Sequence, residues 1–139
     1  MSLNFGEINI WAVLVSAAAT FMVGGLWYAA LFAAAWAKAN AFNEEELKAM
    51  AAKQGRNFGI FFVADLVMAV VISLLIINLG IDSWAGGASL GLGLWLGIAA
   101  TIGGAKKAAY NKPLSVYLID TSHELACLLV MGAILGGWR

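Results

Sequence analysis

Four long apolar runs fill most of the 139-residue chain, and short polar segments separate them. The first and third runs contain no Asp, Glu, Lys or Arg, whereas the second contains one such residue and the fourth contains two. Each run reaches the roughly 20 residues with which an α-helix crosses about 30 Å of hydrocarbon. The pattern predicts four membrane-spanning helices, at residues 8–30, 57–79, 84–104 and 113–136.

The composition supports a bilayer as the surroundings of the chain. Apolar residues make up 63% of it, charged residues 12%, against about 45–50% and 25% in soluble domains. The fold class we expect is all-α, an integral membrane four-helix bundle that forms a single domain over residues 1–139. The net charge is zero and no basic stripe is present, which excludes a nucleic-acid partner. A lone cysteine, Cys127, excludes a disulfide framework.

The polar segment after the first run predicts a short helix at residues 43–54. Asn43 is a typical N-cap, and Glu46 stands three residues later, where a capping box places its acidic partner. Gly55 is a residue that can end the helix. A narrow apolar stripe favours a position on the membrane surface, and a solvated connector is the alternative.

Basic residues predict the orientation of the chain. Seven of its eight Lys and Arg residues lie in the connections 38–56 and 105–112, and the eighth is Arg139. Because basic loops stay in the cytoplasm, both termini are expected outside. Trp36 and Tyr110 would then belong to the aromatic belt at the inner interface.

Glycines crowd the third run. Gly87 and Gly91, and likewise Gly93 and Gly97, are separated by three residues. Such small-x3-small patterns allow helix backbones to approach closely in lipid. We expect these four glycines to lie at a helix contact, made either within the chain or with a second copy, and we expect a homo-oligomer.

One short motif occurs twice. Gly25-Leu26-Trp27 in the first run is repeated as Gly93-Leu94-Trp95 in the third. It indicates a weak internal repeat, a parallel duplication of a two-helix unit. The spacing of the other shared residues is not constant.

Ionisable residues interrupt the second and fourth runs. Asp120, His123 and Glu124 stand at positions i, i+3 and i+4 of one predicted helix, with Tyr117 on the same face. Asp65 lies in the second run at a similar depth, since both aspartates are about 10–12 Å from the start of their runs at 1.5 Å per residue. We therefore expect the aspartates to share a site.

Charged groups inside a bilayer are costly and mark functional sites. Several carboxylates and one imidazole in a dry layer need compensation by shared protons, a bound cation or a basic substrate. Tyr28 and Tyr117 can add hydroxyl groups. Asp120 and His123 also have the spacing by which helix bundles present a carboxylate and an imidazole to one metal, with Glu124 as a further ligand. A divalent metal ion is thus one candidate cofactor.

Five short motifs are spread over nearly the whole chain: Gly25-x-Trp27-Tyr28, Leu66-Val67-Met68-Ala69, Leu92-Gly93-Leu94-Trp95-Leu96-Gly97, Leu118-Ile119-Asp120 and Val130-Met131-Gly132-Ala133-Ile134-Leu135. Together they resemble the bacterial membrane family catalogued as domain of unknown function 1761. The resemblance implies a small four-span protein of the bacterial inner membrane, and it implies no activity. Asp65 and the His123-Glu124 pair are not part of it.

Three classes of function remain. The one we favour is a protein that binds or translocates a proton, a metal ion or a small cation at the Asp/His/Glu cluster, because the negative charges have no fixed counter-cation in these segments. The second is a membrane enzyme that acts on a lipid-soluble substrate with His123 or Glu124 as acid or base. The third is an interaction protein whose glycine-rich helix recruits partners.

Overall fold

A computed structural model describes residues 4–139, and every regular element in that range is helical. In chain order the elements are the 3₁₀ turn η1 (Phe5–Glu7), α1 (Ile10–Gly25), the π-helix η2 (Leu26–Leu31), α2 (Ala33–Ala39), α3 (Glu44–Ala52), α4 (Gln54–Leu79), α5 (Trp84–Leu94), the π-helix η3 (Trp95–Ala99), α6 (Ala100–Ala109) and α7 (Leu114–Gly137). The all-helical prediction is confirmed for the described residues.

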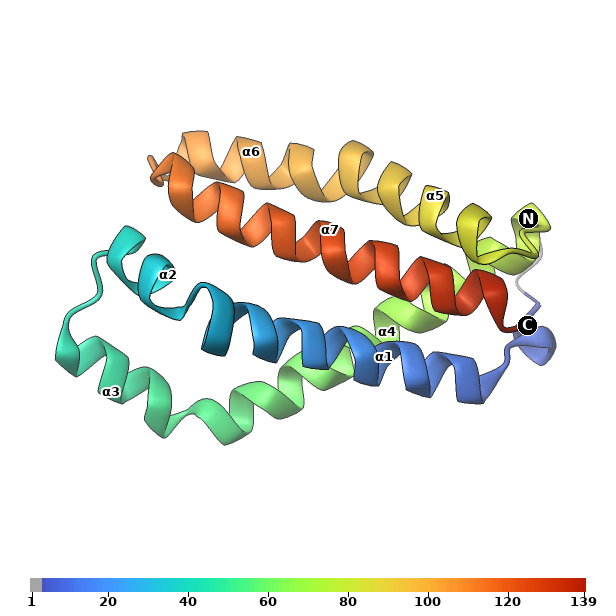
Figure 1. Ribbon diagram of the computed structural model, residues 1–139, viewed down its shortest axis with the longest axis horizontal. Coiled ribbons are helices and arrows are strands. Elements are labelled where there is room, and N and C mark those ends of the chain that lie inside the picture. Colours follow the sequence, from blue (N-terminus) through green and yellow to red (C-terminus); the bar gives the residue numbers. More distant parts are fainter. Residues whose placement is uncertain (1–3) are drawn as a thin grey trace.

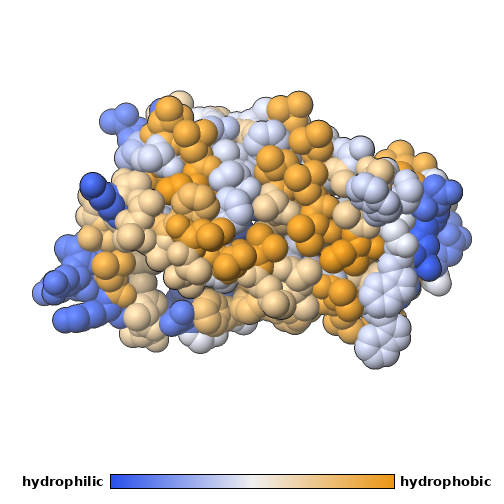
Figure 2. Space-filling view, in the orientation of Figure 1, coloured by the Kyte–Doolittle hydropathy of each residue, from blue (hydrophilic) through white to orange (hydrophobic). Residues whose placement is uncertain are grey.

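Four helical stretches are long and apolar enough to cross a membrane. They are Ile10–Leu31, Gln54–Leu79, Trp84–Ala109 and Leu114–Gly137. The prediction of four such helices is confirmed, with ends that differ from the expected ones by up to five residues. Figure 2 shows apolar side chains over the middle of the visible face and hydrophilic ones toward its two ends, the distribution expected of a chain that crosses a bilayer.

Helix α7 holds the molecule together. It packs against α1, α4, α5 and α6, and α4 crosses behind α1 (Figure 1). Ala17, Ile76 and Met131 form part of the core where α1, α4 and α7 meet. One end of the molecule carries η1 and the end of α7, and the opposite end carries α2 and α3 (Figure 1). The lysine-bearing segments therefore gather at the second end.

Two of the expected glycines make the contact between α5 and α7. A Cβ atom on Gly87 would overlap the carbonyl oxygen of Gly132, and one on Gly91 would overlap that of Leu128. The two helices thus approach backbone to backbone, which only residues without a side chain permit. The partner of this glycine pair is α7 of the same chain.

The other two glycines lie on the opposite side of the same helical stretch. A Cβ atom on Gly93 or Gly97 would meet no atom within 4 Å, and both residues are exposed. Ser89 and Thr101, each one turn away, are exposed as well. The structure therefore does not place Gly93 and Gly97 at a contact within the chain.

The short loop helix has the expected beginning and a different end. The Asn43 side chain accepts a hydrogen bond from the Glu46 backbone N–H, and the Glu46 carboxylate accepts one from that of Asn43, each at 2.9 Å. The prediction that Gly55 ends the helix is wrong, because α3 ends at Ala52 and Gly55 lies in the first turn of α4. No left-handed residue is needed here, since Lys53 joins the two helices with a negative φ of −98°.

Candidate functional site

The π-helix η2 directs two aromatic side chains of the first long apolar helix toward α7. Trp27 donates from Nε1 to the Ile119 carbonyl at 3.1 Å, and the Tyr28 hydroxyl donates to Asp120 Oδ1 at 2.7 Å. A π-helical turn holds one more residue than an α-helical turn, changes the direction of the side chains that follow, and often occurs at functional sites. The chain then bends at Phe32, where φ is −122°, and continues as α2.

Asp120 receives a second hydrogen bond from α2. Trp36 Nε1 donates to the same Oδ1 atom at 3.1 Å. The residue that we expected in the aromatic belt is thus also a hydrogen-bond partner of Asp120. Both donors are neutral, and no lysine or arginine is a hydrogen-bond partner of Asp120 in the part of the chain that the structure describes. The hydrogen bonds that hold the carboxylate in place therefore come from neutral groups.

His123 lies one turn further along α7. Its Nε2 atom is 3.3 Å from Cys127 Sγ, and its ring centroid is 5.0 Å from that of Tyr28 and 6.3 Å from that of Trp27. A Cβ atom on Gly24 would be only 3.3 Å from Nε2. The glycine in α1 therefore leaves the space that the imidazole needs.

Asp65 belongs to the next group of polar side chains. It lies beside the Thr20 hydroxyl and close enough to Cys127 to act electrostatically on its thiol. The Cys127 thiol also contacts the Thr20 carbonyl, with 3.8 Å between sulfur and oxygen. Since Thr20 precedes Tyr28, the hydrogen-bond partner of Asp120, by eight residues, or about 12 Å of helix, the two aspartates lie against different turns of the first helical stretch and not in the one site that we expected. The reason is that α4 begins before Asn57 and crosses α1 at an angle (Figure 1).

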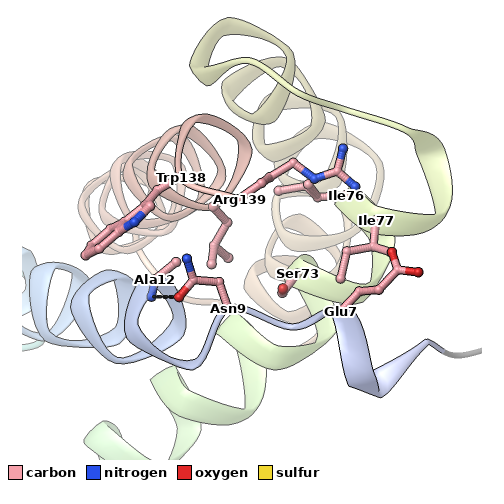
Figure 3. Close-up of a pocket in the computed structure, with 9 residues that line it drawn as sticks. Glu7, Asn9, Ala12, Ser73, Ile76, Ile77, Trp138 and Arg139 are labelled. Carbon is pink, nitrogen blue, oxygen red and sulfur yellow. Dashed lines mark hydrogen bonds between the residues drawn. The ribbon is translucent and has the colours of Figure 1, made fainter.

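Two buried serines extend the polar groups toward the other end of the molecule. Ser16 is 0% exposed in α1, and Ser73, buried in α4, lines a cavity of about 10 Å³ near the termini. Figure 3 shows Ser73, Asn9 and Glu7 around this cavity, which has room for about one water molecule. We call the whole series between α1, α4 and α7 the polar file; its members are Asp120, Tyr28, His123, Cys127, Thr20, Asp65, Ser16 and Ser73.

A larger cleft lies between α6 and α7, near the lysine-bearing end. Its volume is about 230 Å³. Asp120 and Glu124, one turn apart on α7, both line it, as does Tyr117, whose hydroxyl donates to the Ala100 carbonyl at 3.0 Å. The rest of the lining is Gly103, Lys106, Lys107, Tyr110, Lys112, Val116 and Thr121. Asp120 is thus shared by the cleft and the polar file, whereas Glu124 lies on the cleft side.

The three residues expected to hold a metal ion have different surroundings. Asp120 bonds to side chains of α1 and α2, His123 contacts Cys127, and Glu124 lines the cleft. Within residues 4–139, no group of three His, Cys, Asp or Glu side chains is placed to hold a metal ion. The spacing of i, i+3 and i+4 puts the Cβ atoms of Asp120, His123 and Glu124 on one face of α7. That face is wide enough for the three side chains to contact different neighbouring helices and so not to converge on one metal ion.

Two residues that contact the site, Thr20 and Trp36, were not identified as site residues from the sequence. Thr20 gave a weak signal as a hydroxyl residue inside an apolar run, yet such residues commonly bond to their own helix, as its Oγ1 also does to the Ser16 carbonyl at 3.0 Å. Trp36 gave no signal, because a tryptophan near the end of a membrane helix is typical of the interface.

The polar file lies entirely inside a range shared with other proteins. The family model described as protein of unknown function (DUF1761) matches residues 11–136. No curated protein and no solved structure matches the chain. Any inference about function therefore depends on the chemistry of the site itself.

Proposed function

The chain belongs to the family of proteins of unknown function DUF1761, and we propose that it is a multi-pass membrane protein that binds a proton or another small cation at Asp120 and passes it along the polar file. One observation carries the proposal: polar side chains lie at the interface of α1, α4 and α7, with Tyr28 in contact with Asp120 and His123 in contact with Cys127, and a cavity is lined by Asp120 at one end of the series and by Ser73 at the other. Chains of Asp, Glu and His inside membrane helices are the usual form of a proton relay.

The surroundings of Asp120 favour an exchangeable positive partner. Tyr28 and Trp36 orient its carboxylate through Oδ1 and leave the charge uncancelled. Since the cleft reaches Asp120, a proton can be supplied from that side.

Packing in the middle of the file favours the proton over larger ions. Ser16 is 0% exposed, Thr20 1% and Cys127 4%. Protein interiors are packed at the density of organic crystals, so a hydrated ion has no room between these groups. A proton can move between neighbouring hydroxyl, thiol and imidazole groups by exchanging hydrogen bonds. The three lysines around the cleft also repel an approaching cation.

The setting that we propose is the bacterial inner membrane, with the cleft facing the cytoplasm and both termini outside. The lysine-bearing segments lie at the cleft end, which supports this orientation by the positive-inside rule. We also propose that the protein is a homo-oligomer, with Gly93 and Gly97 on the shared face. Their exposure and the small-x3-small spacing support that choice.

Proton flux into liposomes tests the proposal. Purified protein is reconstituted with a pH-sensitive dye inside, and a potassium diffusion potential drives the flux. Wild type should acidify the lumen faster than empty liposomes, and Asp120→Asn should lower the rate to that of empty liposomes. Asp82→Asn, a change in the exposed turn between α4 and α5, is the matched control and should keep the wild-type rate. Equal rates for wild type and Asp120→Asn, with and without added sodium or divalent ions, would contradict the proposal.

A membrane enzyme is the second candidate, and one contact favours it. His123 and Cys127 are 3.3 Å apart, a distance at which an imidazole can activate a thiol nucleophile. The thiol is buried between α1 and α7, so a substrate would reach it only after helix movement. Rapid labelling of Cys127 by a membrane-permeant maleimide in wild type would favour the enzyme, and protection from labelling favours the polar file.

A further inference from the structure

We propose that the cleft between α6 and α7 binds a small group that carries both a phosphate and an ammonium, as the headgroup of an amine-bearing phospholipid does. The site shares Asp120 with the polar file but does not depend on proton transfer. It rests on the volume of the cleft, its depth in the molecule and the arrangement of its charges.

One side of the cleft is basic. Lys106 and Lys107 occupy the last turn of α6, and Lys112 follows in the connection to α7. Cationic residues are favourable at a helix C-terminus, because the free carbonyl groups there are partly negative. Three lysines that converge on one cleft are a suitable binding site for a phosphate group.

The other side is acidic. Glu124 and Asp120 lie one turn apart on α7 and both line the cleft. Asp120 already accepts two hydrogen bonds through Oδ1, and the Tyr117 hydroxyl donates to a backbone carbonyl. Glu124 is therefore the carboxylate of this cleft best placed to receive an ammonium group.

The balance of charges selects the ligand. An anion without a positive group would be repelled by Glu124 and Asp120, and a simple cation would be repelled by the lysines. A group of both signs satisfies the two sides at once. The volume of about 230 Å³ is smaller than the roughly 300–1,000 Å³ of pockets for drug-sized ligands, so a headgroup fits better than a larger molecule.

The depth of the cleft points to lipid as one source of this group. Tyr110 and Lys112 lie at its outer end, in the connection that leaves the membrane segments. Tyrosine and lysine at this level typically contact lipid headgroups. A soluble aminophosphate that enters from the aqueous side has the same chemistry and is the other source.

Lipid binding to delipidated protein in detergent tests the proposal by native mass spectrometry. The probes are phosphatidylethanolamine, phosphatidylglycerol with the same acyl chains, and soluble phosphoethanolamine. Wild type should bind the ethanolamine lipid about tenfold more tightly than the glycerol lipid, as expected for one charge-assisted hydrogen bond to the ammonium group. Glu124→Gln should remove that preference, and Lys106→Gln should weaken the binding of both lipids.

Three controls separate the outcomes. Lys48→Gln on the exposed helix α3 should behave as wild type, and Lys107→Gln should weaken both lipids if Lys106→Gln fails to fold. Asp65→Asn interrupts the polar file and should keep the lipid preference, so failure of the proposed function would leave this inference standing. Displacement of the lipid by phosphoethanolamine supports the site and adds a soluble source. Equal binding of the two lipids by wild type, or an equal loss in Lys48→Gln, would overturn the proposal.

Discussion

A single carboxylate oxygen of Asp120 accepts hydrogen bonds from two aromatic residues on different helices, Tyr28 at 2.7 Å and Trp36 at 3.1 Å. An arginine in either position would bind the carboxylate and also cancel its charge. Neutral donors fix the geometry and leave the charge to be compensated by a mobile partner. Because its donors are neutral, Asp120 can bind and release a proton in our proposal, and its role is not limited to holding the helices together.

The Tyr28 hydroxyl provides a test at this scale. Tyr28→Phe removes the shorter hydrogen bond and should lower the free energy of unfolding by about 1.5–3 kcal/mol, the usual contribution of a hydrogen bond to a charged group. Proton flux should fall in parallel, because Asp120 loses its orientation. Thermal unfolding in detergent and the liposome assay measure the two effects. Tyr110→Phe, at an exposed tyrosine, is the control, and the same loss in both variants would argue against a special role for Tyr28.

Part of the site was predictable from residue type alone. Ionisable residues in apolar runs single out Asp65, Asp120 and His123, and all three lie in the polar file. Glu124 carries the same signal but lies on the cleft side, because neighbouring positions on one helix face meet different helices. Thr20 and Trp36 could not be found in this way, since their own positions in the sequence are ordinary for membrane helices.

At the scale of elements, the two copies of the Gly-Leu-Trp motif make similar contacts. Trp27 lies in the π-helix η2 and Trp95 begins the π-helix η3, and each tryptophan donates to a backbone carbonyl of α7. Trp27 bonds to Ile119 at 3.1 Å, and Trp95 bonds to Thr121 at 2.7 Å. The two bonds attach η2 and η3 to the same turn of α7, at carbonyls two residues apart. Sequence periodicity predicts a continuous helix at both motifs, because a π-turn depends on contacts with the neighbouring helix.

Loss of one of these bonds should be measurable. Trp95→Phe removes the Nε1 donor from the Thr121 carbonyl and should lower the free energy of unfolding by about 1 kcal/mol. Trp84→Phe, at an exposed tryptophan of the same apolar run, serves as the control. Unfolding in mixed detergent micelles measures both variants. No difference between them would show that the π-helix is held by packing and not by this bond.

The glycines of α5 allow a second test of an element. Gly87→Ala places a methyl group against the Gly132 carbonyl and forces α5 and α7 apart, which should cost about 1–3 kcal/mol. In protein kept monomeric in detergent, Gly93→Ala places the same group in open space and should be neutral or stabilising by up to about 1 kcal/mol, the difference in helix propensity. Melting temperatures of the two variants decide the matter. A Gly93→Ala loss as large as that of Gly87→Ala would show that Gly93 also lies at a contact, as it would in an oligomer.

For the whole molecule, hydropathy predicts the number of long apolar helices and their approximate limits, because span length is set by the bilayer. Hydropathy does not predict the relative depth of residues on different helices. Asp65 and Asp120 appear level when each is counted from the start of its apolar run, but α4 crosses α1, and Asp65 lies beside Thr20 whereas Asp120 bonds to Tyr28. Crossing angles depend on how helix surfaces fit together, and counting residues along one run carries no information on them.

The exposed face of α5 and α6 should be where copies of the chain meet. Ser89→Cys places a thiol in the row that contains Gly93 and Gly97, and it should form disulfide-linked dimers in native membranes under mild oxidation. Val67→Cys, on the lipid-exposed side of α4, is the control and should remain monomeric on a non-reducing gel. Cross-linking of both variants, or of neither, would contradict the proposed interface.

Proton flux through Thr20→Val tests the polar file most directly. Valine keeps the shape of threonine but has no hydroxyl group beside Asp65. Thr101→Val is a closely matched control, since each threonine hydroxyl bonds to carbonyls three and four residues earlier in its own helix and Thr101 lies outside the file. We expect Thr20→Val to reduce the flux about tenfold, equivalent to about 1.4 kcal/mol, and Thr101→Val to leave it unchanged. Wild-type flux in Thr20→Val would show that protons do not pass between Asp120 and Asp65.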